Sequence, residues 1–339
     1  MNNLSRAGIV AFDSDVSKVL RPSGRALLDA VAEYHGKPAE YRHIGPLATH
    51  GQALELRKSL FAAAPGLEDL SSKLQETLKG ACAVFIPKLG LDGFSTSDRA
   101  ILAYALAVSV GNPTATDKKQ VIWDVLARKR DSTYFSTFSE TDAEAAYHTD
   151  TQYYPAPEPS FMLYVMEAAR CGGGFSSVLD ARALRADIEK NLPWVAEVLS
   201  DRALPFRVPS AFVTGGDPDT VEATLAPIFA PEPLIRYRRD TLTQGLLYFP
   251  EHADAAAHQA LDAFELELKR CQHQADFFMP SDSMVFLDNH RCLHARTAFQ
   301  DHNRHLLRIR MRNEALVHTT SNFPLVKKHV PSLSSLHLR

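Results

Sequence analysis

The sequence MVFLDNHRCLHARTAFQDHNRHLLRIRM, residues 284–311, contains two short apolar runs that flank a segment rich in chemically active side chains. The runs cover residues 284–287 and 305–311, and a Pro-Ser-Asp turn precedes the first. Short apolar runs bounded by turn residues are typical of buried strands. This stretch therefore predicts two strands, with the polar residues 288–299 directly after the first.

Similar short runs dominate the sequence from about residue 120 onward. Further strand candidates, separated by proline and glycine clusters, are residues 120–125, 134–138, 161–166, 176–179 and 246–249. Two helices, 181–192 and 253–274, interrupt them, but strands and helices do not alternate regularly. The phosphate-binding motifs GxGxxG and GxxxxGK[ST] do not occur, which disfavours a nucleotide-binding parallel sheet. Many short strands predict a mainly β fold, an antiparallel barrel or jelly roll with flanking helices.

The first quarter of the chain has a different pattern, with apolar residues at helical spacing in residues 23–34, 54–64 and 67–79. We expect residues 1–79 to form a helical region packed on the core, and residues 80–339 to form the jelly-roll domain. Residues 201–245 are rich in Pro, Gly and Arg and have weak periodicity. They are interpreted either as a long surface insertion or as a lid over a pocket.

Composition and charge exclude several classes of protein. The 339 residues include 37 Lys+Arg and 40 Asp+Glu, for a net charge of −3, so neither nucleic acid nor an anionic membrane is an expected partner. The longest strongly apolar run, residues 101–110, is too short to cross a bilayer. The N-terminal residues show no signal-peptide pattern. The four cysteines are far apart, so we expect no disulfide framework and a reducing, cytoplasmic location. The oligomeric state is left open.

The first chemically interesting pattern is His148-Thr149-Asp150. Residues two apart in an extended segment point to the same side, so an imidazole nitrogen and a carboxylate oxygen can meet one cation. The HxD pattern occurs by chance in many proteins, and alone it is a weak indication of a metal site.

His294 supplies a third candidate ligand, 144 residues beyond Asp150. Two imidazoles and one carboxylate on one face leave three positions open on an octahedral iron(II), which is the geometry of non-haem iron oxygenases. The same three side chains also fit a catalytic zinc ion.

Arginines form the third pattern. If residues 304–311 form a strand, Arg304, Arg308 and Arg310 share one face. A buried guanidinium needs an anion, and a carboxylate bound through two hydrogen bonds fits best. For Arg310 and Arg312 the favoured interpretation is an exposed cationic strand face.

Four motifs occur in an order that resembles the taurine dioxygenase/clavaminate synthase-like family of Fe(II)- and 2-oxoglutarate-dependent oxygenases. They are His148-Thr-Asp150, Gly173-Gly-Phe-Ser176, the segment Asp288 to Phe299, and Arg304-His-Leu-Leu-Arg308. The resemblance covers residues 80–312, about two thirds of the chain. It implies a double-stranded β-helix (jelly-roll) core that binds Fe(II), with 2-oxoglutarate and O2 as cosubstrates and succinate and CO2 as coproducts.

Positions within the motifs imply roles for individual residues. His148, Asp150 and His294 match the iron ligands of the family. Arg308, fourteen residues after His294, matches the arginine that grips the distal carboxylate of 2-oxoglutarate, and Arg304 matches a second basic position.

Ser176 stands where many members of the family have a threonine that contacts the same carboxylate, and Ser177 is an alternative to it. Halogenating relatives replace the ligand carboxylate with a small residue. The carboxylate of Asp150 therefore implies a hydroxylase, or another oxidative type such as a desaturase.

The substrate is less well defined. Glu140, Gln152, Tyr153 and Arg236 (or Arg238) are candidates to line its pocket, although each also fits an ordinary structural role. A polar, partly cationic pocket suits a small carboxylate or amino acid, either free or tethered to a carrier protein. A role in natural-product biosynthesis follows from family analogy alone.

Two other classes of protein remain as alternatives. A zinc-dependent hydrolase would use the same three ligands. It would not need to bind a dicarboxylate, which is the role that Arg308 and Ser176 would have in an oxygenase. A non-catalytic jelly-roll binding or sensor protein would keep the pocket without turnover.

Overall fold

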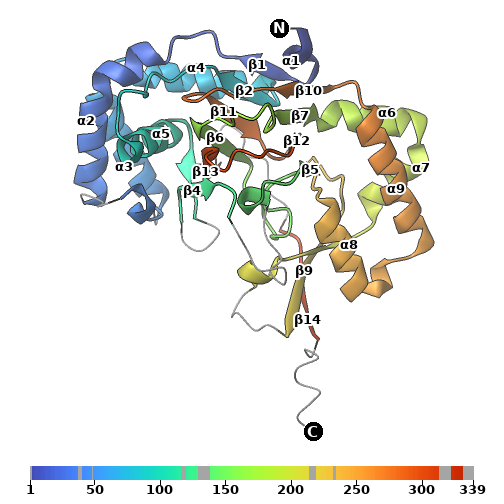
Figure 1. Cartoon of the computed structure of the whole chain (residues 1–339). Coiled ribbons are helices and arrows are strands. Elements are labelled where there is room, and N and C mark those ends of the chain that lie inside the picture. The colour runs from blue at the N-terminus through green and yellow to red at the C-terminus, as the bar shows by residue number, and fades with distance from the viewer. Residues whose placement is uncertain are drawn as a thin grey trace.

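The computed structural model describes residues 2–36, 40–47, 49–115, 120–128, 138–213, 219–231, 234–312 and 322–330. Strands occupy the middle of the molecule and helices flank them on two sides (Figure 1). The helices are α1 (Asn2–Arg6), α2 (Ser17–His35), α3 (His50–Ala63), α4 (Leu67–Gly80), α5 (Thr96–Val110), α6 (Ala181–Asn191), α7 (Pro193–Asp201), α8 (Arg239–Tyr248) and α9 (Ala255–Arg270). Within these described ranges, no helix combines the length and hydropathy that a membrane span needs.

The strands form three sheets. The major sheet has the order β1 (Ile9–Ala11), β2 (Ala83–Ile86), β11 (Met284–Asp288), β6 (Ser160–Glu167), β13 (His305–Arg312), β3 (Asn112–Pro113), and β4 (Trp123–Val125) also pairs with β13. The minor sheet has the order β10 (Gln274–Phe277), β7 (Ser176–Asp180), β12 (Cys292–Arg296), β5 (Ala145–His148). The third sheet consists of β14 (Leu325–His329), β9 (Thr220–Ala226) and β8 (Leu204–Arg207). Neighbouring strands are antiparallel except for the β1–β2 pair.

The major and minor sheets pack face to face. One apolar cluster contains Phe161, Val285 and Leu306 from the major sheet together with Val178 and Ala275 from the minor sheet. Burial of alternate side chains from both sheets removes apolar surface from water and supplies the main driving force for this arrangement. The sheet-rich, helix-flanked fold predicted from the sequence is confirmed.

Helices cover the outer faces of both sheets. Helices α2 to α5 pack against the major sheet through a cluster that includes Tyr164 and Phe286, and α5 is buried on almost every side. Helices α6, α7 and α9 pack against Leu179 and Leu293 of the minor sheet. Residues 1–79 contain helices α1 to α4, the short 3-10 helix η1 (Tyr41–His43) and also strand β1.

The predicted strand at residues 246–249 is wrong, because this segment ends helix α8. Leu242, Gly245 and Leu246 share one buried helix face, at spacings of three and four residues. A Cβ on Gly245 would overlap the carbonyl oxygen of Pro205, so the glycine permits α8 to lie directly on β8. The candidate strand at residues 134–138 lies outside the described residues except for Phe138.

One pair of cysteines lies close together, which the expectation of no disulfide framework did not anticipate. The structure joins Cys82 and Cys292 in a disulfide, with their Cα atoms 5.5 Å apart. The two residues are 210 positions apart in sequence, but the N–H of Asp288 donates to the carbonyl of Cys82, which ties the start of β2 to the segment before β12. Sequence spacing could not reveal this contact because it depends on the strand order of the major sheet.

A buried carboxylate attaches η1 to the major sheet. Asp124 of β4 accepts hydrogen bonds from Tyr41 Oη at 2.6 Å, Arg42 Nε at 2.8 Å and His305 Nε2 at 2.7 Å. Burial alone would raise the pKa of Asp124, but the hydrogen bonds from His305, Arg42 and Tyr41 hold it below its usual range. The ionised form is therefore the one that the folded state stabilises.

Replacing Asp124 with Asn is expected to lower the free energy of unfolding by about 2 kcal/mol at pH 7, a usual value for hydrogen bonds to a charged group. Because the folded-state pKa of Asp124 is depressed, its contribution is complete above the unfolded value of about 3.9 and is lost as the pH falls further. Urea unfolding of both proteins between pH 3 and pH 8 measures this. A wild-type advantage that persists undiminished at pH 3 would contradict the charge-based explanation.

Candidate metal centre

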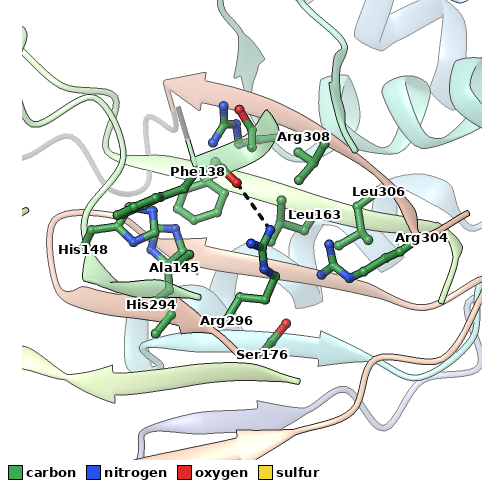
Figure 2. Close-up of a pocket in the computed structure, with 14 residues that line it drawn as sticks. Phe138, Ala145, His148, Leu163, Ser176, His294, Arg296, Arg304, Leu306 and Arg308 are labelled. Atoms are coloured by element: carbon green, nitrogen blue, oxygen red, sulfur yellow. Dashed lines mark hydrogen bonds between the residues drawn. The ribbon is translucent and has the colours of Figure 1, made fainter. Parts of the chain in front are cut away.

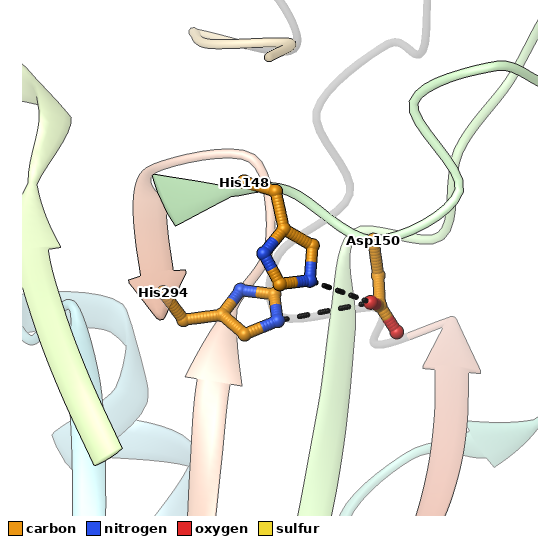
Figure 3. A group of neighbouring side chains, drawn as sticks. All are labelled: His148, Asp150 and His294. Carbon is orange, nitrogen blue, oxygen red and sulfur yellow. Dashed lines mark ion pairs between the residues drawn. The ribbon is translucent and has the colours of Figure 1, made fainter. Parts of the chain in front are cut away.

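Two neighbouring strands of the minor sheet bring the predicted histidines together. His148 is the last residue of β5, and His294 lies within β12. The two residues are directly paired in the antiparallel register, so their side chains project from the same face of the sheet. Their ring centroids are 4.1 Å apart (Figure 3).

Asp150 follows His148 by two residues, where the chain leaves β5. Its backbone N–H donates to Asn289 Oδ1 at 2.7 Å, and Asn289 Nδ2 donates to the Asp150 carbonyl at 3.0 Å. This pair of bonds fixes the turn that aims the carboxylate at the histidines. The sequence interpretation gave Asn289 no role, although a polar residue two positions after the strand at 284–287 was a usable signal.

The three predicted ligands converge. Asp150 Oδ1 lies 3.9 Å from His148 Nε2 and 3.7 Å from His294 Nε2, and one potential ligand atom from each residue lies within 4.8 Å of the others. His148 Nδ1 is 2.8 Å from the carbonyl of Ala146, which fixes the ring and leaves Nε2 directed at Asp150. Burial lowers the pKa of His148 and lowers that of His294 to about 4, so both rings are neutral, the form that binds metals.

Two guanidiniums lie beside Asp150. Arg308 Nη1 is 3.0 Å and Arg310 Nε is 3.2 Å from Asp150 Oδ2. Burial alone would raise the pKa of Asp150, but these guanidiniums lower it below its usual range and keep the carboxylate ionised. The predicted exposed position of Arg310 is wrong, because Arg310 shares a face of β13 with Arg308 and also contacts Asp150, whereas Arg312 is exposed as expected.

A cavity extends from the histidines along the space between the two sheets, and we call it the arginine cavity. Figure 2 shows His148 and His294 at one end, Arg304 at the other, and Arg296 between them. Arg304 is 5% exposed, and its Nη1 has no hydrogen-bond partner in the part of the chain that the structure describes. Burial and the nearby Arg296 lower the pKa of Arg304 to about 9. A guanidinium buried in this way favours an anionic ligand.

Glycine and serine residues of the Gly173-Gly-Phe-Ser176 motif adjoin this cavity. Gly174 has a φ of +74°, which glycine adopts without strain. A Cβ at this position would lie only 3.1 Å from Arg304 Nε, so glycine also leaves room for the arginine. Ser176 lines the arginine cavity, and its hydroxyl lies 3.4 Å from Met279 Sδ. Ser177 faces the opposite side of β7 and lines a separate hollow beside Tyr147.

A second cavity lies on the other side of Asp150, and we call it the Gln152 cavity. Gln152 and Tyr153 line it, together with Phe212, Arg238, Arg308 and Arg310. Of the other substrate candidates, Glu140 is buried and is not part of the described lining of either cavity.

The structure does not bring Arg236 to a cavity that holds the other site residues. Its guanidinium is 1% exposed and donates to the backbone carbonyls of Gln152, Tyr154 and Pro155. These bonds fix the chain that follows the metal ligands.

Comparison with known proteins agrees with this geometry. The family model described as taurine catabolism dioxygenase TauD, TfdA family matches residues 43–310. Asparagine oxygenase in complex with Fe(II), 2S,3S-3-hydroxyasparagine and succinate is similar in structure, with a TM-score of 0.61, 13% identity, and coverage of 90% of this chain and 93% of the other. Non-heme iron oxygenase OrfP in complex with Fe and alpha-ketoglutaric acid gives a TM-score of 0.58 at 14% identity, covering 93% and 98%. No curated protein sequence matches the chain. At such low identity the structural likeness establishes a shared fold.

Proposed function

The chain belongs to the TauD, TfdA family of dioxygenases, and from this premise we propose that His148, Asp150 and His294 hold its iron and that it hydroxylates a small carboxylate or amino-acid substrate. The enzyme is an Fe(II)- and 2-oxoglutarate-dependent oxygenase. The observation that carries the ligand assignment is the convergence of three ligand atoms within 4.8 Å. When bound, iron(II) with 2-oxoglutarate and O2 supplies the oxidation of an unactivated C–H bond, and succinate and CO2 are the coproducts.

The residues around the ligands orient them and exclude water. The bond from His148 Nδ1 to Ala146 sets the ring orientation, and the aromatic rings of Phe138 and Phe161 pack 4.8 Å from His148 and 4.9 Å from His294. Since both imidazoles are neutral and the carboxylate is ionised, the ligand set carries a single negative charge, which suits a divalent cation. No side-chain general base is required.

We assign the distal carboxylate of 2-oxoglutarate to Arg304 and Ser176, at the end of the arginine cavity away from the histidines. The family resemblance gives this role to Arg308, but Arg308 lies 3.0 Å from Asp150, next to the metal ligands. Arg304 has a buried, unpartnered Nη1 and lines the same cavity as Ser176. The two residues together offer a cationic fork and a hydroxyl to one carboxylate.

The Gln152 cavity is the proposed substrate site. Asp150 is the single acidic side chain in its described lining, whereas Arg238, Arg308 and Arg310 are cationic. This charge distribution favours a substrate carboxylate beside Arg308. Solved relatives contain hydroxyasparagine and hydroxy-arginine, which supports an amino-acid substrate. The substrate is either free or tethered to a carrier protein, as in natural-product biosynthesis. Succinate release from free and from carrier-bound amino acids distinguishes the two.

We further propose that the two facing sheets form a double-stranded β-helix core within residues 80–339, with the helices of residues 1–79 packed on it. Residues 201–245 are proposed to cover the substrate, because Phe212 and Arg238 from this region line the Gln152 cavity. The desaturase alternative uses the same centre. The hydrolase alternative is disfavoured because it leaves Arg304 and Ser176 without a role.

Anaerobic addition of Fe(II) and 2-oxoglutarate is expected to produce a weak visible metal-to-ligand charge-transfer band, whereas Zn(II) in place of Fe(II) should produce none. Screening amino acids, free and carrier-bound, for substrate-dependent succinate release under air then identifies the substrate. A folded, iron-loaded protein that shows no band with 2-oxoglutarate would refute the proposed function.

A further inference from the structure

Arg296 has a position that the ligand assignments do not explain. It lies on β12 two residues after His294, and it pairs across the sheet with Ser176 of β7. Its side chain is 8% exposed and lines the arginine cavity between the histidines and Arg304 (Figure 2). Among the described residues no acidic side chain forms an ion pair with it, although the carboxylate of Asp142 lies close enough to raise its pKa against the effect of burial.

The Nη atoms of Arg296 bind the segment of residues 138–143, which we call the wall. Nη1 donates to the carbonyl of Phe138 at 3.3 Å, and Nη2 donates to the carbonyls of Thr141 at 3.0 Å and Ala143. Three hydrogen bonds from one charged group fix a segment without regular sheet pairing, and the chain continues from it into β5.

The wall separates the two cavities. Phe138 and Ser139 line both the arginine cavity and the Gln152 cavity. The Phe138 ring packs edge-on against His148, with centroids 4.8 Å apart, and the guanidinium of Arg238 lies 4.0 Å from the centroid of the same ring. The position of the wall therefore affects both the ligand His148 and the proposed substrate site.

Arg296 is also close to the second buried guanidinium. Arg296 and Arg304 lie 4.7 Å and 4.9 Å from the centroid of the same Phe299 ring. Two buried positive charges without an anion repel one another, and burial weakens the screening between them. Arg296 Nε and Arg304 Nη1 both lack hydrogen-bond partners in the described ranges, so each guanidinium keeps a donor for a bound anion while the Nη atoms of Arg296 remain on the wall.

We propose that Arg296 is a positioning residue that couples occupancy of the arginine cavity by 2-oxoglutarate to fixation of the wall against His148. The inference rests on the proposed function, because it takes 2-oxoglutarate as the anion beside Arg304. Binding of the anion removes the repulsion that loosens Arg296, so the wall becomes more stable. Because coupling is reciprocal, a fixed wall also raises the affinity for 2-oxoglutarate by the same factor.

Hydrogen exchange of the Zn(II)-loaded enzyme, which does not turn over, tests this coupling. In the wild type, 2-oxoglutarate is expected to slow exchange in peptides covering residues 138–148 at least fivefold, a factor at the lower end of known coupling effects. In Arg296→Gln this ligand-dependent slowing should vanish, and the Kd for 2-oxoglutarate should rise about fivefold. Arg296→Lys keeps the positive charge, but its single ammonium group cannot reach three carbonyls. This variant should therefore keep most of the affinity for 2-oxoglutarate and lose most of the ligand-dependent slowing of hydrogen exchange.

Arg291→Gln is the matched control. Arg291 also lies beside β12 and pairs with Asp180 at 2.6 Å, but it does not line the arginine cavity. The Arg291→Gln variant should leave the slowing of hydrogen exchange by 2-oxoglutarate unchanged. If Arg296→Gln speeds exchange of the wall equally with and without 2-oxoglutarate, Arg296 is only structural and the proposal is overturned. A wild type that does not bind 2-oxoglutarate overturns the proposed function and this inference together.

Discussion

Replacing Asp150 with Ala is expected to reduce 2-oxoglutarate turnover at least a thousandfold and to abolish the visible charge-transfer band. The carboxylate supplies one of three ligands, and it also neutralises Arg308 and Arg310, at 3.0 and 3.2 Å. Without it, two guanidiniums remain beside the place of a divalent cation. Breaking a buried pair of this kind also lowers the free energy of unfolding by about 3–5 kcal/mol. The thousandfold loss of turnover corresponds to about 4 kcal/mol of activation free energy.

Asp150→Asn separates the effects of charge and volume, because the amide has almost the same shape as the carboxylate. It should bind Fe(II) nearly as poorly as the alanine variant. Asp262→Ala, which removes an exposed aspartate that pairs with Arg239, is the control and should behave like the wild type. The ligand assignment fails if Asp150→Ala, folded as judged by circular dichroism, keeps turnover within tenfold of the wild type.

The features that could be predicted from the sequence are those encoded locally. The helix at residues 67–79 is observed as α4, because its apolar spacing is sufficient to define it. The spacing of His148 and Asp150, with His294 in a later strand, predicted the three groups that the β5–β12 register brings together. Such local predictions hold in the folded protein because side chains alternate between the two faces of a strand, so spacing in the sequence fixes the direction of each side chain.

The features that the sequence did not reveal depend on contacts between distant segments. Strand alternation put Arg310 on the same face as Arg308, but its burial against Asp150, 160 residues earlier, depends on the fold. Cys82 and Cys292 are neighbours only because β2 and β11 pair. The residues of the C-terminal half of α8 have the apolar composition of a strand, and only packing against β8 decides in favour of the helix.

The arginine that grips 2-oxoglutarate can be identified by the selectivity between two oxo acids. Arg304→Gln is expected to raise the Kd for 2-oxoglutarate about a hundredfold, since a hydrogen bond to a charged group contributes up to about 3 kcal/mol and each 1.4 kcal/mol is tenfold. The wild type should prefer 2-oxoglutarate to 2-oxopentanoate, which has the same chain length without the distal carboxylate. In Arg304→Gln that preference should largely disappear, because the lost partner belongs to the distal carboxylate alone.

Arg308→Gln is the matched comparison, since both arginines line the arginine cavity and four residues separate them on the chain. It should weaken substrate binding and metal binding through Asp150, but it should keep the preference for 2-oxoglutarate over 2-oxopentanoate. The unliganded Arg304→Gln protein should also unfold no earlier than the wild type, because the substitution removes a buried charge that has no acidic partner among the described residues. The opposite pattern, with selectivity lost in Arg308→Gln and retained in Arg304→Gln, would return the distal carboxylate to Arg308. In that case 2-oxoglutarate would lie along Asp150 instead of extending towards Ser176.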